Sequence, residues 1–392
     1  MKKYEKLRKK IVLHLTFQFF IKKTSITACL PLLSMEKGLK YRSSKPVAIW
    51  LLIGVGMIII QVLLGGITRL TGSGLSITEW KPIMGTLPPI NEHDWNNAFE
   101  KYKQIAQYKY LNSYFTLHDF KFIYFWEWFH RLWARLIAVA FLIPFIIFIV
   151  QKRFKSKMIR PMIILFLLGA IQGLVGWIMV KSGLEDSDAL YVSHYKLAIH
   201  FVLALGVLCY ALWFALELLV PKEQLIVNRS LEKFTGWLIA LLIIQLIYGA
   251  FMAGLKAATT APTWPDINGS WFPVNVHSFG SHTFNGLSFL TDHPLVVHFI
   301  HRNLAYLITV LVFIWWLKTE RIQGKKLFEQ VRIVPLLLVL IQVLLGIFAV
   351  LSATNKNIFL WIGISHQFVA MLLLLSLVLN IYLIRIKIFS TN

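Results

Sequence analysis

Eight apolar segments constrain the fold of this chain more than any other feature. They lie at residues 47–67, 123–150, 161–180, 195–220, 235–255, 295–317, 333–351 and 358–384. A helix needs about 20 residues to cross the hydrocarbon core of a bilayer, whereas the strands of a membrane barrel are about 10 residues long and alternate in polarity. The sequence therefore predicts an all-α polytopic membrane protein with eight transmembrane helices.

The positive charge of the chain is placed as in a membrane protein. A net charge of +22 could also suggest nucleic acid, but the basic residues gather in three places: before the first segment, between the second and third, and between the sixth and seventh. The loops at 182–193 and 257–294 contain no Lys or Arg. By the positive-inside rule we expect both termini in the cytoplasm and no nucleic-acid partner. The basic loop at 68–122 breaks the pattern, but long loops count less in that rule.

The N-terminal extension, residues 1–45, is basic and falls outside the expected fold. Its apolar run, 11–21, is too short to span a bilayer. Residues 1–34 suit a signal-like or transit-like leader, or Met35 is the natural start.

A Gln-x-x-x-Gly pattern recurs once in each odd-numbered segment. The four copies begin at Gln61, Gln172, Gln245 and Gln342. An amide one helical turn from a glycine suits close helix packing and an interhelical hydrogen bond, which is the role we favour. The order of features in the first half is repeated in the second. We therefore expect two pseudo-symmetric four-helix bundles, at 46–220 and 235–386, joined by a cytoplasmic linker at 221–234.

Four histidines lie at similar depths in the even-numbered segments: His130, His200, His301 and His366. An ionisable ring inside a bilayer is costly and by default indicates a functional site, and imidazole is a good axial ligand of haem iron. Two pairs of rings would hold two haems. The alternative is four structural or proton-relaying histidines.

The two halves differ three residues before their first histidine. Glu127 precedes His130 by one turn, whereas His298 precedes His301. A haem that is itself altered needs an acid or base, which a haem kept for electron transfer does not. We therefore expect Glu127 to be catalytic; the alternative is a charge pair with Arg131 or Arg69.

Arginine follows the first histidine in both halves, as Arg131 and Arg302. These side chains could bind haem propionates through charge-assisted hydrogen bonds or extend to lipid headgroups, and the sequence leaves this open. We expect His194 and His298 to be structural.

The segment from Gly65 to Pro82, GGITRLTGSGLSITEWKP, closely resembles the first outer loop of the haem A synthase family, which oxidises haem O during cytochrome oxidase assembly. The resemblance extends over about residues 45–385. It continues through Glu127 to Arg131, Leu197 to His200, His301 to Tyr306, and His366-Gln367.

This resemblance implies a reaction and a ligand set. The ring methyl of haem O becomes a formyl group through an alcohol and a hydrated aldehyde. His130 and His200 match the ligands of the substrate haem iron, His301 and His366 match those of a haem b, and Glu127 matches the acidic residue of the active site. The haem b would pass electrons.

The resemblance also implies surroundings and partners. Partners would be haem O synthase and an electron donor or acceptor in the membrane; homo-oligomerisation is left open. The membrane would be the bacterial cytoplasmic membrane or, alternatively, the mitochondrial inner membrane. Some relatives carry a cysteine pair in outer loops. Here Cys29 and Cys209 are the only cysteines and neither lies in such a loop, as in the cysteine-free subgroup that includes mitochondrial forms.

Two rival functions fit parts of the pattern. A b-type cytochrome that only transfers electrons needs the four histidines and leaves Glu127 incidental. A transporter is compatible with paired repeats but does not require histidines at matching depth.

Overall fold

The computed structural model describes residues 45–79, 84–154, 156–185, 189–273, 278–279 and 282–385. The chain divides into two units, Met1–Lys45 and Pro46–Asn392, and the second contains everything described below. The expected leader at 1–34 and Cys29 lie outside the described residues.

Within the described residues, eight helices are long and apolar enough to cross a membrane, which confirms the all-α membrane class. They are α3 (Lys45–Leu70), α6 (Leu117–Val150), α7 (Ser156–Lys181), α8 (His194–Leu219), α9 (Arg229–Gly254), α11 (Pro294–Glu320), α13 (Val334–Leu351) and α14 (Lys356–Leu383). The seventh span also includes the short α12 (Lys326–Val331).

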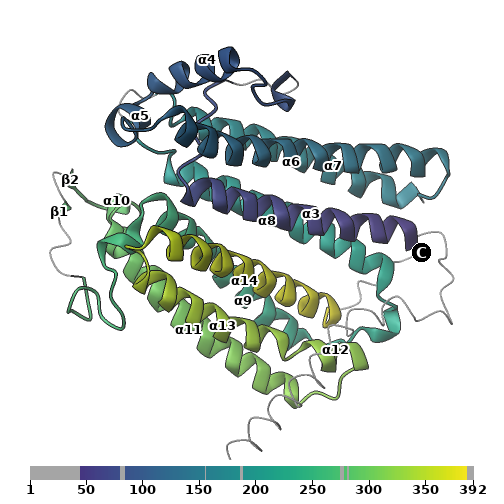
Figure 1. Ribbon diagram of the computed structural model, residues 1–392. Coiled ribbons are helices and arrows are strands. Elements are labelled where there is room, and N and C mark those ends of the chain that lie inside the picture. Colours follow the sequence, from purple (N-terminus) through teal and green to yellow (C-terminus); the bar gives the residue numbers. More distant parts are fainter. Residues whose placement is uncertain are drawn as a thin grey trace, which may run out of the picture. The chain divides into compact units, whose positions relative to one another are not determined.

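Short elements are attached to both ends of the long helices. One end carries α4 (Glu92–Lys103), α5 (Ala106–Leu111), α10 (Leu287–Thr291) and the antiparallel strands β1 (Ser278–Phe279) and β2 (His282–Thr283), whereas α12 lies at the other (Figure 1). The single-turn helices are η2 (Met84–Thr86), η3 (Lys222–Gln224) and η4 (Ala257–Thr260).

Helices α6 and α9 begin furthest ahead of their predicted segments, at 117 against 123 and at 229 against 235. Helix α6 starts at Leu117 rather than at 123, because Thr116 forms a capping box with Asp119. Its first turns then pack Phe120 into a cluster of buried side chains with α4. Helix α9 starts at Arg229, inside the expected linker, because the Asn228 side chain accepts a hydrogen bond from the Leu231 backbone N–H at 3.0 Å.

The long helices form successive layers. Helices α6 and α7 lie along one side, α3 and α8 next, then α14 and α9, and finally α11 and α13 (Figure 1). Helix α8 contacts α9 and α14, and Gln367 of α14 donates to the Val62 carbonyl oxygen of α3 at 2.9 Å. The first and last spans of each half therefore meet in the middle. Many outward side chains, such as Ile146 and Leu167, are exposed and apolar, as a helix surface facing lipid requires.

Candidate functional site

Each of the four histidines lies against the glycine of a Gln-x-x-x-Gly element on the preceding long helix. A Cβ atom added to the glycine would come close to the ring carbon Cε1 in every case. These distances are 2.9 Å for Gly65 and His130, 2.7 Å for Gly176 and His200, 3.3 Å for Gly249 and His301, and 3.1 Å for Gly346 and His366.

The glutamine of the same element contacts the same histidine in three of the four cases. Gln172 Nε2 lies 3.0 Å from the His200 carbonyl oxygen and 3.1 Å from its Nδ1. Gln245 repeats this toward His301, at 3.0 Å from the carbonyl oxygen and 3.4 Å from Nε2.

In the other two elements the glutamine contacts differ. Gln342 Nε2 lies 3.1 Å from His366 Nε2. No hydrogen bond to His130 is described for Gln61. The Oε1 atoms of all four glutamines are buried and have no hydrogen-bond partner among the described residues. Interhelical hydrogen bonding by this motif was expected, but its direction toward the histidines was not.

The second pair of histidines is spaced to face one ion. The ring centres of His301 and His366 are 6.4 Å apart. A bond between a metal and an imidazole nitrogen is about 2.0–2.1 Å long, so two imidazole nitrogens that bind one ion lie about 4 Å apart. The ring centres lie farther apart, by one ring radius on each side, which agrees with the observed distance of 6.4 Å. The Nδ1 atoms of both rings are buried and without a partner among the described residues. The residues present therefore fit an iron ion, which His301 and His366 would hold.

The four histidines line one cavity of about 1260 Å³. Small-molecule pockets are typically about 300–1,000 Å³, so this space exceeds that of a single ordinary ligand. Its walls come from helices of both halves and are mostly apolar. Glu127 also lines it. The structure thus brings the predicted ligands and the predicted acid to one hollow region.

Glu127 is buried, with 3% of its surface exposed, and both carboxylate oxygens are bonded. Oε2 accepts hydrogen bonds from the Ser76 hydroxyl at 2.7 Å and the Ile77 backbone N–H at 2.8 Å. Oε1 pairs with Arg131 at 2.5 Å. The carboxylate therefore ties the loop after α3 to α6. Ser76 and Ile77, from the loop sequence, were not among the predicted site residues.

Arg131 completes the attachment of this loop. Beyond Glu127, its Nη2 donates to the Ile77 carbonyl oxygen at 3.1 Å and its Nη1 to that of Glu79 at 3.3 Å. The alternative sequence reading, a Glu127–Arg131 pair, is thus present, and it coexists with the position of Glu127 on the cavity wall.

Arg302 makes the corresponding attachment in the second half. It donates to three loop carbonyl oxygens, those of Thr263 at 2.9 Å, Pro265 at 3.0 Å and Asp266 at 2.6 Å. The buried His298 lies 3.1 Å from Arg302, between its Nε2 and the arginine Nη2. His298 thus takes the position of Glu127 relative to the arginine.

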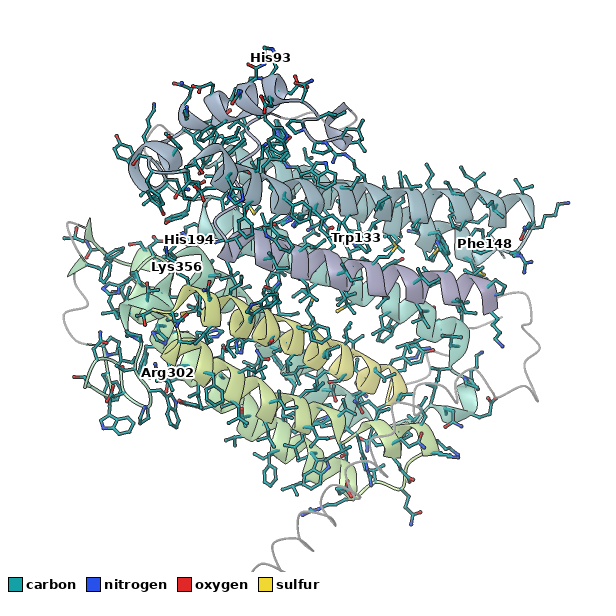
Figure 2. The ribbon with its side chains drawn as sticks, viewed as in Figure 1. His93, Trp133, Phe148, His194, Arg302 and Lys356 are labelled. Atoms are coloured by element: carbon teal, nitrogen blue, oxygen red, sulfur yellow. The ribbon has the colours of Figure 1, made fainter. Side chains whose placement is uncertain are left out.

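Arg69 and His194 lie at the same end of the helices. Arg69 donates to the carbonyl oxygens of Ala253 at 2.5 Å and Gly254 at 3.0 Å, which joins α3 to α9; it does not pair with Glu127. His194 Nε2 lies 2.8 Å from Asp292 Oδ1. Figure 2 shows His194, Lys356 and Arg302 toward the end that carries α10, and Phe148 toward the opposite end.

The chain matches a known protein family over most of its length. Residues 48–378 match the family described as cytochrome oxidase assembly protein. The chain is 39% identical over 342 residues to "Heme A synthase" of Flavobacterium psychrophilum, an alignment that covers 85% of this chain and 96% of that protein. It is 38% identical over 337 residues to "Heme A synthase" of Nitrosospira multiformis, covering 85% and 92%.

Proposed function

The chain belongs to the cytochrome oxidase assembly protein family, and from that membership we propose how its site converts haem O to haem A. The chain is an enzyme that oxidises haem O at a ring methyl group to give the formyl group of haem A. The b-type cytochrome that only transfers electrons is not favoured. Two successive oxidations, each adding one oxygen atom and passing two electrons to an acceptor in the membrane, would form an alcohol and then a hydrated aldehyde, which loses water.

His130 and His200 would hold the iron of the substrate haem O, and His301 and His366 that of a resident haem b. The spacing of the second pair, the buried Nδ1 atoms and the large apolar cavity support this assignment. When bound, the haem b supplies one-electron redox chemistry, and its potential depends on its ligands and on their hydrogen bonds. The protein orients the two rings and excludes water with apolar walls.

Glu127 would take the proton released at each oxidation of the methyl carbon. It lies one turn from His130 on the same helix and lines the same cavity. Arg131 and the Ile77 N–H compensate its charge at 2.5 Å and 2.8 Å, so the carboxylate is held in one orientation before the substrate arrives. Preorganised polar groups of this kind need no reorganisation during the reaction. The second half has His298 at this position and would not carry out the chemistry.

Arg131 and Arg302 would contribute to binding of the haem propionates from the cavity wall. Both arginines line the cavity, and a guanidinium carries five N–H donors. Several of these donors already bond loop carbonyl oxygens, so each arginine would bind a propionate while it holds its loop.

The two halves would be pseudo-symmetric four-helix bundles, 46–220 and 235–386, derived from one ancestral unit. The four equivalent His–Gly contacts and the paired arginine–loop contacts support this. The chain is a multi-pass membrane protein. We propose the bacterial cytoplasmic membrane, with both termini inside, because the relatives named above are bacterial and the basic loops lie at the α12 end. Haem O synthase would supply the substrate.

One observation carries this proposal: four histidines and one buried glutamate from two repeated halves line a single cavity. The test is to express the chain beside a haem O source and extract the pigments. A formyl-bearing haem identifies the enzyme, whereas haem B with unchanged haem O would identify an electron carrier and overturn the proposal.

A further inference from the structure

We propose that each Gln-x-x-x-Gly element is a seat that positions one haem-ligating histidine, rather than a general helix-packing motif. The inference rests on the proposed function, since it concerns the same four histidines. It assigns a positioning role to eight residues: Gln61, Gly65, Gln172, Gly176, Gln245, Gly249, Gln342 and Gly346. None of these is expected to contact the methyl group that reacts.

The glycines provide the first argument, because their contacts are specific. In α7, Gly176 faces His200, but a Cβ on Gly169 or Gly173 would meet nothing within 4 Å. In α9, Gly249 faces His301, whereas a Cβ on Gly236 would meet only Ile381 at an ordinary 3.9 Å. Gly254 on α9 and Gly66 on α3 are also closely packed, but against His194 Cβ and the Gln367 side chain rather than against an imidazole ring. Among these glycines, the motif glycines are the ones that face the edge of an imidazole ring.

The glutamines provide the second argument. The contacts of Gln172 and Gln245 with a backbone carbonyl, both at 3.0 Å, require the amide nitrogen at that position, because a carbonyl oxygen only accepts. The amide is thereby fixed next to the ring. Generic packing would place these amides against any neighbouring backbone, yet three of the four contact the histidine of the following long even-numbered span.

Ligation chemistry provides the third argument. An imidazole that binds a metal through one nitrogen donates the N–H of the other to an acceptor, which fixes the ring and raises its basicity. The four Oε1 atoms are buried acceptors without a partner among the described residues. In two elements the amide lies beside ring Nε2, at 3.1 Å for Gln342 and His366 and at 3.4 Å for Gln245 and His301. The Nδ1 atoms of these two rings have no partner there, so they are the nitrogens left to bind iron. We infer that the Gln342 amide turns its oxygen toward the ring and accepts a hydrogen bond from His366 Nε2–H when the histidine binds iron.

The glycine test uses a matched pair on one helix, Gly176→Ala and Gly173→Ala. Alanine favours a helix over glycine by about 1 kcal/mol, so neither change is expected to unfold α7. The added methyl would stand 2.7 Å from His200 Cε1 in the first variant and in open space in the second. We expect purified Gly176→Ala to lose the low-spin absorption and electron paramagnetic resonance signals of the haem at this site, as His200→Leu does, and Gly173→Ala to keep them.

The same test can be applied to all four elements. The Cβ distances predict that the spectral loss caused by a glycine-to-alanine change decreases in the order Gly176, Gly65, Gly346, Gly249. Unmodified spectra in both Gly176→Ala and Gly65→Ala would overturn the inference. Unmodified spectra in His200→Leu would instead refute the ligand assignment in the proposed function, so the two failures are distinguishable.

A glutamine test remains if an alanine variant does not fold. Gln342→Leu removes the acceptor for His366, and Gln342→Glu strengthens it. Because a stronger acceptor makes the imidazole more basic and hydrogen bonding to ligands tunes the iron, we expect the reduction potential of haem b to rise in the first variant and fall in the second. Equal potentials in both variants and the unmodified protein would overturn the seat assignment for this half.

Discussion

Glu127 and Arg131 stand one helical turn apart on α6 and form an ion pair of 2.5 Å, while the second carboxylate oxygen of Glu127 holds the Ser76 hydroxyl at 2.7 Å. One carboxylate thus has two roles: it holds the loop after α3 and it lines the cavity. Substitutions can separate them, because an amide oxygen still accepts the hydrogen bonds of Ser76 and Ile77, although the Arg131 pair is lost, and an amide does not take up a proton.

Glu127→Gln should keep the fold and the second haem, since the side chain is nearly isosteric. Haem A formation should fall by about 100-fold to 10,000-fold, the usual contribution of a positioned acid or base, and haem O or the alcohol should accumulate. Pigment extraction measures both. The control, Ser76→Ala, loosens the loop but leaves the carboxylate, and should retain most of the activity. Haem A production at the unmodified rate by Glu127→Gln would show that this carboxylate only anchors the loop.

His301→Leu and His366→Leu should each lower the b-type absorbance and the haem content of the purified protein, because iron loses an axial ligand. His194→Gln serves as the control, since His194 bonds Asp292 at 2.8 Å and has no part in the proposed ligation. Full haem content in both leucine variants would exclude these residues as ligands.

Reporter fusions should locate the loops on two sides of the membrane. A reporter after Arg153 or Lys325 should be cytoplasmic, and one inserted within 182–193 should be external, because basic loops stay inside. The opposite pattern would place the four histidines in the inner half of the bilayer.

Arg69→Leu should destabilise the contact between α3 and α9. Two hydrogen bonds to backbone carbonyl oxygens, at 2.5 and 3.0 Å, are lost, and a hydrogen bond to a charged group is worth about 1.5–3 kcal/mol. Denaturant titration in detergent measures the change in the free energy of unfolding. Arg385→Leu is the comparison, because its pair with Glu217 at 3.3 Å is partly exposed and such pairs contribute about 0–1 kcal/mol. Equal effects of the two substitutions would argue against a stabilising role of Arg69.

Hydropathy was sufficient to predict the eight spans, because burial in lipid imposes a length and a polarity that each segment shows by itself. It did not predict where α6 and α9 begin. Those ends depend on the caps at Thr116 and Asn228 and, for α6, on the packing of Phe120 against α4. These contacts involve particular neighbouring residues, and the mean hydropathy of a segment carries no information about them.

The site was predictable in its residue types but not in its pairings. The cost of burying an ionisable ring singled out the four histidines in the sequence, and the difference between the two halves singled out Glu127. The hydrogen-bond partners of Arg131 and Arg302 could not be predicted, because they are backbone carbonyl oxygens of loops. Every residue has such an oxygen, so the sequence does not distinguish one partner from another. The glutamine motif was visible as a repeat, but only the structure shows that it points to the histidines.

Arg131 and Arg302 each follow a site histidine by one residue, and each donates hydrogen bonds to the loop that precedes its own helix. The helical turn that carries the histidine therefore also holds this loop in place. A protein that binds such a loop in one of its positions would change the affinity of the cavity for its ligand. Thermodynamic reciprocity requires the ligand to change the affinity of that protein for the loop by the same factor. Binding of a haem in the cavity would therefore strengthen or weaken protein binding at the loop.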